Sequence, residues 1–327
     1  MASFRQRSGT WQARVRTKGF PDEVKSFSTK AEAVAWAREV EASMHKGSYQ
    51  DTYSAKDWLL GDLLRRYMVE VSPTKRSAKR ERETITFMLR QRMAQYSMAK
   101  LTPAVVAAYR DERMMTVSAG TIIRELSILS SAISHARREW GLPTGNPCAL
   151  VRKPQSPQGR QRLLTSDERR RLLEELRPVG RRSPWMLPLV ELALETAMRR
   201  GELLALEWRH VDLTAQTAFL EMTKNGSSRS VPLSKAAVRI LEGLPKGDCQ
   251  RVFPLSYMVV NNCFVKARNR AGIGDLHFHD LRHTATTGLA EKLPNVIELA
   301  SVTGHQTIQM LKRYYHPKAQ ELARKLG

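Results

Sequence analysis

The sequence predicts a mainly helical protein with small β elements, an α+β fold divided among several domains. Apolar residues recur at helical spacing through nearly all of residues 58–151. Short alternating runs within residues 9–27 and 218–233 predict two small sheets. The 327 residues are also too many for a typical single core. We therefore expect a sheet-plus-helix unit at 1–50, a helical domain at 57–152, a linker at 153–162 and a further domain at 163–327.

The composition favours a polyanionic partner and argues against a membrane protein. The chain has 54 Lys and Arg against 32 Asp and Glu, a formal net charge of +22, which favours nucleic acid as the partner. No stretch approaches the roughly 18 apolar residues that span a bilayer, and the first residues lack the apolar segment of a secretory signal. The cysteines show no paired spacing, so we expect buried, reduced thiols in a cytoplasmic protein: Cys148, Cys249 and Cys263.

The first 50 residues predict a small sheet covered by a helix. Residues 9–16 and 24–27 have strand character with a turn between them, and Ser28 to Lys30 cap a helix over 31–44. This surface is either a DNA-binding one or a solvated ribbon that keeps the chain soluble. The DNA-binding candidates on this surface are Arg14 and Arg16. The full set of basic side chains predicted to share the surface is Arg5, Arg7, Arg14, Arg16, Lys18 and Lys25.

The second segment predicts a bundle of four or five helices. One helix has an apolar face that begins at Leu59, and another begins with Thr102 as N-cap and Pro103 in its first turn. Between them, a loop at 75–82 is rich in positive charge. It is either an ordinary solvated charge run or a phosphate-binding segment, and its candidate DNA contacts are Lys75, Arg76, Lys79 and Arg80.

An arginine interrupts a nearly continuous apolar stretch at residues 188–208. Arginine is unusual in such a setting unless it is paired or directed at an anion. Arg199 is the candidate, Glu202 is its acidic partner, and Arg200 is the alternative register. Farther on, short strands flank a turn that places Lys224 at the tip of a hairpin, either as an ordinary solvated lysine or within reach of a bound ligand.

Residues 277–316 combine imidazoles, an arginine and two tyrosines in a helical pattern. His279 and Arg282 are three residues apart, which puts them on one face of a helix. Gly304 is placed to end a helix, with His305 directly after it. Tyr314 follows Arg313 in a basic segment.

These motifs resemble those of the tyrosine recombinases, the phage integrase family. That family carries T-G-x-R, then H-x-x-R, then G-H, and then a tyrosine in an R-Y-x-H context. The chain matches the last three motifs, with 23 residues from Arg282 to His305 and 9 from His305 to Tyr314. Tyr314 fits the last motif, whereas Tyr315 would leave His316 adjacent. In the first motif Ala197 replaces the usual glycine.

The resemblance implies a mixed α/β catalytic domain that cuts DNA by covalent catalysis. Tyr314 would attack the phosphate and form a 3′-phosphotyrosyl link, while Arg199 and Arg282 would hold its non-bridging oxygens. Lys224 would be the general acid for the leaving 5′-oxygen. By the same resemblance, His279 and His305 would orient the phosphate and the tyrosine, and His279 would also help to move the phenolic proton. Glu202 would support the first motif.

The resemblance also implies the partners and the domain roles. We expect double-stranded DNA recombination sites, a homotetramer on synapsed DNA and accessory DNA-bending proteins, with no membrane, metal or other cofactor. Residues 1–50 would be an arm-like DNA-binding domain, 57–152 a core-binding domain and 163–327 the catalytic domain. Within the family, the chain looks especially like the shufflon-type DNA invertases, although integration, excision and inversion would use the same residues.

Three other classes of protein compete with this interpretation. A metallohydrolase could use His279, His283 and His305 as ligands, although Arg282 would place a cation beside the metal. A DNA-binding regulator on the same fold predicts loss of a catalytic residue, and a type IB topoisomerase would share the chemistry without choosing sites. Within the recombinase interpretation, His283 is expected to be structural, either packed or helix-capping.

Overall fold

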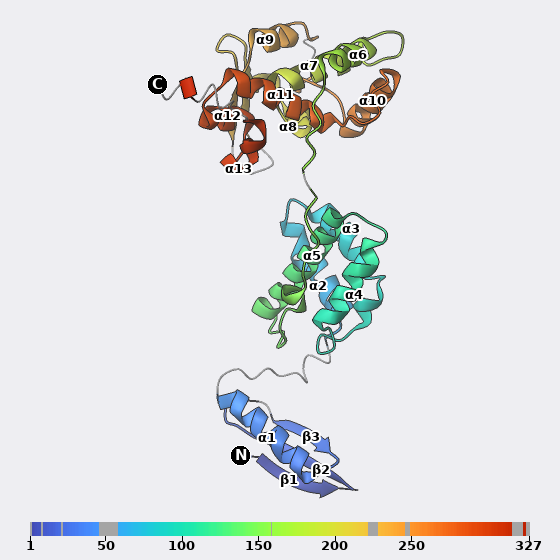
Figure 1. Cartoon of the computed structure of the whole chain (residues 1–327), viewed down its shortest axis with the longest axis vertical. Helices are drawn as coiled ribbons and strands as arrows, with labels where there is room; N and C mark the ends of the chain where they lie inside the picture. Colours follow the sequence, from blue (N-terminus) through green and yellow to red (C-terminus); the bar gives the residue numbers. More distant parts are fainter. Residues whose placement is uncertain are drawn as a thin grey trace. The chain divides into compact units, whose positions relative to one another are not determined.

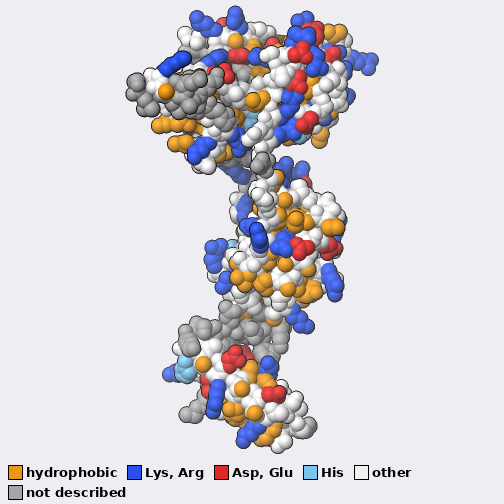
Figure 2. All heavy atoms as spheres, viewed as in Figure 1, with side chains coloured by type: hydrophobic (Ala, Val, Ile, Leu, Met, Phe, Trp, Pro, Cys, Tyr) orange, Lys and Arg blue, Asp and Glu red, His pale blue; other side chains and the backbone are white. Residues whose placement is uncertain are grey.

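The computed structural model describes two compact units, Met1–Gln158 and Gly159–Gly327 (Figure 1). None of the described helices has the length and apolar composition needed to cross a membrane. On the face drawn in Figure 2, Lys and Arg side chains are spread over both units, in keeping with the net charge of +22. The residues that the structure describes are 2–7, 9–20, 22–45, 58–157, 159–221, 228–245, 249–315 and 323–324.

The N-terminal segment forms a three-stranded antiparallel sheet with one helix on it. The strands are in the order β1 (Ala2–Arg7), β2 (Thr10–Val15) and β3 (Glu23–Phe27), and α1 (Lys30–His45) packs across them. The strand β1 was not predicted. The start of α1 was predicted, and a capping box forms it. The hydroxyl of Thr29 and the carboxylate of Glu32 each accept a hydrogen bond from the other residue's backbone N–H.

The register of this sheet divides the predicted basic surface. Arg14 pairs with Ser3 across β1, so it shares the open face with Arg5 and Arg7. Lys25 pairs with the buried Ala13 and therefore lies on the helix-covered face, where its Nζ is 5.3 Å from the centroid of the Phe27 ring. The prediction that Lys25 shares the basic surface was wrong.

Asp22 partly neutralises the basic surface that remains. Its Oδ2 accepts from Arg14 Nη2 at 2.7 Å and from Arg16 Nε at 2.8 Å. These hydrogen bonds hold the pKa of the exposed Asp22 below its ordinary value. Arg14 and Arg16 are thus exposed, as a DNA contact requires, but each shares an acidic neighbour in the free chain.

The second segment is a helical bundle with its own apolar core. Its helices are α2 (Leu60–Glu70), α3 (Ala78–Met88), α4 (Pro103–Met114) and α5 (Ala119–Glu139), joined by the 3₁₀ turns η2 (Ser72–Thr74), η3 (Arg92–Gln95) and η4 (Pro147–Leu150). Leu60, Leu64 and Tyr67 are buried as the spacing predicts, but Leu59 is exposed because it lies just before α2 begins. Thr102 caps α4 through a hydrogen bond from Val105 N, as predicted.

The basic segment at 75–82 is partly helix rather than loop, because α3 begins at Ala78. Lys75 is occupied within the bundle, since its Nζ donates to Glu81 Oε1 at 2.8 Å and to Tyr67 Oη at 2.5 Å. The other candidates in this segment, Arg76, Lys79 and Arg80, are exposed.

The C-terminal unit surrounds a large apolar core with helices and one small sheet. The sheet is antiparallel, in the order β4 (Val211–Asp212), β5 (Thr217–Leu220) and β6 (Arg229–Pro232). The helices are α6 (Ser166–Leu176), α7 (Met186–Thr196), α8 (Arg200–Ala205), α9 (Lys235–Glu242), α10 (Tyr257–Arg270), α11 (Phe278–Lys292), α12 (Val296–Thr303) and α13 (Ile308–Leu311), with the 3₁₀ turns η5 (Trp208–His210) and η6 (Lys312–Tyr314). Among them, α7 packs on α6, α9, α10 and α11.

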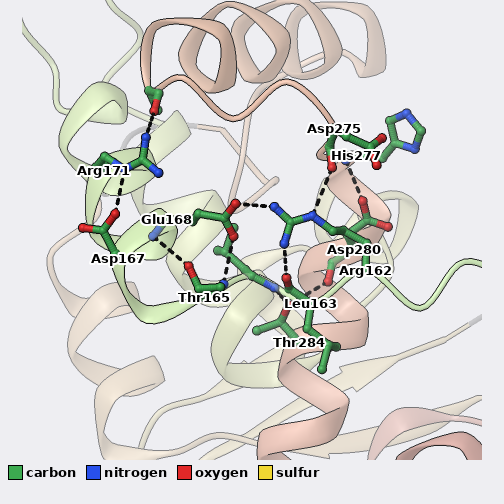
Figure 3. Close-up of polar contacts among 12 residues, drawn as sticks. Arg162, Leu163, Thr165, Asp167, Glu168, Arg171, Asp275, His277, Asp280 and Thr284 are labelled. Carbon is green, nitrogen blue, oxygen red and sulfur yellow. Dashed lines mark hydrogen bonds and ion pairs between the residues drawn. The ribbon is translucent and has the colours of Figure 1, made fainter.

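The end of the predicted linker is bound to this unit by ion pairs. Arg160 donates through Nε to both carboxylate oxygens of Asp280 at 2.9 Å, and through Nη2 to Asp275. Arg162 bonds Glu168 and the carbonyl oxygen of Asp275, as Figure 3 shows. The positive charges of Arg160 and Arg162 are therefore paired with carboxylates of the same unit.

The cysteines lie in different environments. Cys148 is buried, Cys263 is half-buried and Cys249 is exposed, and all three are free thiols. The prediction that they are buried holds for Cys148 and is wrong for Cys249, which lies in the polar connection between α9 and α10.

Candidate active site

Arg199 lies at a sharp turn between α7 and α8. Ala197 ends α7 in the left-handed conformation, with φ 52°, a position that favours glycine and explains why the related motif carries one. Arg199 is then the N-cap of α8, where its backbone N–H donates to Glu202 Oε2 at 2.9 Å and its Nη1 to Glu202 Oε1 at 2.7 Å. The turn, rather than the middle of a helix, carries the predicted arginine.

Glu202 also binds a second arginine, Arg229 of β6. Arg229 Nη2 donates to Glu202 Oε2 at 2.8 Å and Nη1 to Oε1 at 3.1 Å. Burial by itself would raise the pKa of Glu202, but the hydrogen bonds from Arg229 and from the Arg199 backbone outweigh burial and lower the pKa to about 2. The carboxylate therefore stays ionised and joins the two arginines.

Arg229 was missed in the sequence, although a signal was present. It shares strand parity with the buried Val231, so an arginine stands at a core-facing position of β6. Its guanidinium lies against Gly304, where a Cβ would be 2.7 Å from Nη1. Arg229 thus connects the first motif to the turn that carries His305.

Arg282 is nearly buried on α11 and spans two other motifs. Its Nη1 donates to the carbonyl oxygen of Ala197 at 2.5 Å and its Nη2 to that of Thr303 at 2.6 Å. Arg199 Nη2 reaches the adjacent carbonyl oxygen of Gly304 at 3.2 Å. Burial, followed by repulsion from Arg199, lowers the pKa of Arg282 to about 10, so that it stays charged at neutral pH.

His305 follows the glycine that ends α12, as the sequence predicts. Gly304 has φ 69°, and its backbone N–H bonds the carbonyl oxygen of Ala300 at 2.7 Å. The His305 ring is held by Thr303 Oγ1, 2.7 Å from Nδ1, and its Nε2 lies 3.5 Å from Arg282 Nη2. Burial and the nearby Arg282 lower the pKa of His305 to about 3, so the ring is neutral at pH 7.

Tyr314 lies in η6, beside two imidazoles. Its ring centroid is 5.9 Å from that of His305 and 5.8 Å from that of His283, with which it is nearly parallel at 27°. Its hydroxyl is in hydrogen-bond contact with His283 Nδ1. Burial raises the pKa of the phenol, against the opposing effect of Arg313 and Arg282.

His279 lies beside His283 on α11. The two imidazole rings are perpendicular, with centroids 5.1 Å apart. Burial, followed by repulsion from His283 and Arg282, lowers the pKa of His279 to about 4. His283 is packed, as expected, and its Nδ1 in addition contacts the hydroxyl of Tyr314. The sequence interpretation had assigned help with the phenolic proton to His279.

Five of the six predicted catalytic residues converge in the C-terminal unit. Arg199, His279 and Arg282 line a cavity of about 280 Å³. His305 adjoins Arg282, and Tyr314 adjoins His305. The sixth, Lys224, lies outside the described residues.

The structure also bears on the alternative arginine, Arg200, and on the alternative metal site. Arg200 stacks on Tyr257, with Cζ 3.6 Å from the ring centroid, and bonds Asn261. In the part of the chain that the structure describes, no three His, Cys, Asp or Glu side chains are grouped to hold a metal ion. The site instead gathers the buried Arg282 and the partly buried Arg199 and Arg229, and Glu202 pairs with the last two. This excess of positive charge is suited to an anion.

Comparisons with known proteins identify the family of the chain. Residues 162–321 match the Phage integrase family. A shufflon-specific DNA recombinase of Escherichia coli is 40% identical over 276 residues, which cover 82% of this chain and 71% of that protein. A putative integrase/recombinase of Haemophilus influenzae is 33% identical over 334 residues, covering 98% and 89%. The chain therefore belongs to the phage integrase family.

Solved structures share the fold. A lambda integrase dimer bound to a COC′ core site matches with a TM-score of 0.66 and 21% identity, covering 97% of this chain and 95% of that one. The Tn1549 transposon integrase in complex with a circular intermediate DNA matches with a TM-score of 0.68 and 16% identity, covering 82% and 99%. The combination of helices with two small sheets is thus a tyrosine recombinase fold, as predicted.

Proposed function

We propose that this chain is a tyrosine-type site-specific DNA recombinase, which cleaves and rejoins strands through a 3′-phosphotyrosyl intermediate. The observation that carries the proposal is the meeting of Arg199, Arg282 and Tyr314 around one cationic site. Each of the three stands in a motif of the family to which the chain belongs. The site has the groups that a transesterification needs, a nucleophile and fixed positive charge.

In this proposal the arginines hold the scissile phosphate between them. Arg199 and Arg282 donate to its non-bridging oxygens, where negative charge grows in the transition state. Both side chains already have partners that fix their position, so little reorganisation accompanies binding. Glu202 braces Arg199, His305 orients the phosphate, and Lys224 protonates the leaving 5′-oxygen.

The remaining parts of the chain are proposed to hold DNA around this centre. Residues 1–50 act as an arm-like DNA-binding domain, 57–152 as a core-binding domain and 153–162 as the linker to the catalytic domain at 163–327. Separate apolar cores support this division: one around Val15 and Met44, a second in the helical bundle and a third in the C-terminal unit. The proposed DNA contacts are Arg14, Arg16, Arg76, Lys79 and Arg80, with Lys75 bracing its segment.

The proposed substrate is a pair of double-stranded recombination sites held by four copies of the chain. Lambda integrase, whose fold this chain shares, has been solved as a tetramer bound to a Holliday junction. The similarity to a shufflon-specific recombinase makes inversion one candidate outcome. We place the protein in the cytoplasm, where its DNA would lie, and expect accessory DNA-bending proteins to assist synapsis.

Covalent capture on nicked DNA tests the proposal. DNA from around the gene is lightly nicked, so that cleavage beside a nick releases a short 5′-hydroxyl fragment and traps the protein on the 3′-phosphate. We expect wild type in EDTA to give a denaturation-resistant complex, whose sequenced ends define one site. Tyr314→Phe should abolish the complex and Tyr315→Phe should not.

Three outcomes would contradict parts of the proposal. A complex that persists in Tyr314→Phe and disappears in Tyr315→Phe would move the nucleophile by one residue. Capture at scattered positions without a shared sequence would indicate a topoisomerase-like enzyme. Absence of any complex, with tight DNA binding retained, would indicate a regulator on a recombinase fold.

A further inference from the structure

The hydroxyl of Tyr314 contacts His283, a residue to which the proposed mechanism above assigns no role. His283 lies on α11, one turn beyond His279, and its Nδ1 is in hydrogen-bond contact with Tyr314 Oη. The two rings are stacked at 27°, with centroids 5.8 Å apart. The contact joins residues 31 apart in sequence, so it depends on how η6 packs against α11.

We propose that His283 is a further catalytic residue, which takes the phenolic proton of Tyr314 during strand cleavage and returns it during resealing. This inference rests on the proposed recombinase function and assigns the proton acceptor within it. Among the described residues, His283 is the one whose side chain bonds the phenolic oxygen.

The other two imidazoles of the site have different surroundings. His305 has Thr303 Oγ1 at 2.7 Å from Nδ1 and the Arg282 guanidinium at 3.5 Å from Nε2. His279 faces the cavity beside Arg199 and Arg282, and its ring stands perpendicular to that of His283. Both are therefore placed to orient a bound phosphate, whereas His283 is placed on the nucleophile.

The charged groups around His283 favour its neutral, proton-accepting form. Burial lowers its pKa most, followed by repulsion from Arg313, while Asp280 acts in the opposite direction and Arg282 and Arg160 add further repulsion. The imidazole is thus neutral at pH 7, with a free lone pair on Nδ1 when its other nitrogen carries the proton. Burial also raises the pKa of the phenol, so direct loss of its proton to water is disfavoured.

The proposed step balances without any further reactant. The proton on Tyr314 Oη moves to His283 Nδ1 as the Oη–P bond forms. The P–O5′ bond breaks with its electron pair on O5′, which takes a proton from the general acid, for which Lys224 is the candidate. In resealing, O5′ attacks phosphorus while its hydroxyl proton returns to the general acid. The P–Oη bond breaks, and the departing Tyr314 oxygen recovers its proton from His283.

The test measures the single-turnover rate of covalent-complex formation on the site that capture defines. We expect His283→Ala to slow cleavage at pH 7 by about 10²- to 10⁴-fold, the usual contribution of general acid–base catalysis. Its rate should then rise about tenfold per pH unit, since only the spontaneously formed phenolate attacks. DNA-binding affinity should be unchanged, because His283 contacts the nucleophile rather than the phosphate.

Two further measurements separate proton transfer from positioning and from folding. In His283→Asn the amide oxygen takes the place of Nδ1, so it can accept the hydrogen bond but cannot take the proton, and we expect cleavage to stay slow. In a substrate with sulfur in place of the scissile 5′-oxygen, the leaving group is a thiolate that needs no proton. This substrate should restore cleavage by Lys224→Ala but not by His283→Ala.

The inference is overturned if His283→Ala cleaves within about threefold of wild type, if His283→Asn restores the rate, or if the sulfur substrate rescues His283→Ala. Each of these results leaves the recombinase function standing, because wild type still forms the complex and Tyr314→Phe does not. Failure of wild type to form any covalent complex would instead count against the proposed function itself.

Discussion

Replacement of Glu202 by glutamine removes the negative charge that joins two partly buried arginines, Arg199 and Arg229. The Glu202 side chain is only 6% exposed, and both of its oxygens accept hydrogen bonds from Arg199 and Arg229. Glu202→Gln keeps the shape of the side chain but leaves the two guanidiniums without a counter-charge. Such a loss is costly because a buried charge is stabilised mainly by its partner.

The pKa of Glu202 sets the magnitude. Its fall from an ordinary 4.5 to about 2 corresponds to about 3 kcal/mol of stabilisation of the folded C-terminal unit. Since the folded-state pKa is lowered, this stability is fully present above about pH 4.5 and is lost as the pH falls towards 2. The difference between wild type and Glu202→Gln should therefore be about 3 kcal/mol at pH 7 and smaller at pH 3.5.

Urea unfolding followed by ¹⁹F NMR of 5-fluorotryptophan measures this difference in the full chain. Trp185 and Trp208 pack against the core of the C-terminal unit, so their signals report its unfolding separately from that of the N-terminal unit. Glu174→Gln is the matched control, because Glu174 pairs with Arg177 on the surface and should change stability by only a small fraction as much. A Glu202→Gln variant within about 1 kcal/mol of wild type at pH 7, or a difference that grows on acidification, would refute the reasoning.

Three further predictions follow from the surroundings of single residues. Gly304→Ala should destabilise the C-terminal unit by more than Gly180→Ala. Both glycines have a positive φ, in which alanine costs about 1–2 kcal/mol, but of the two only Gly304 would place the new Cβ against the Arg229 guanidinium. Equal losses of stability in urea unfolding would contradict this. Tyr109→Phe should destabilise the helical bundle by about 1–2 kcal/mol, because the hydroxyl donates to the buried Glu125 at 2.7 Å; an unchanged urea midpoint would contradict it. In native protein at pH 8, a maleimide should label Cys249 before Cys148, since burial raises the pKa of Cys148 to about 12; mass spectrometry showing early labelling of Cys148 would contradict this.

Features encoded over a few residues were predictable from the sequence. The capping residue Thr102 and the glycine at 304 mark where helices begin and end, because both act on backbone groups within one turn. The family motifs placed Arg199, Arg282, His305 and Tyr314 in register, and the structure brings these four together. The strand β1 was missed because its apolar positions are few and its pairing partner, β2, defines it.

Contacts between distant segments were decided by the tertiary structure alone. His279 and His283 lie one turn apart on α11. The packing of η6 against that helix determines which of the two imidazoles contacts Tyr314. Arg229 joins Glu202 across 27 residues, and Arg160 reaches Asp280 across 120. Local spacing specifies which face of an element a side chain occupies, but the partner of that side chain depends on how separate elements pack, and burial then sets its pKa.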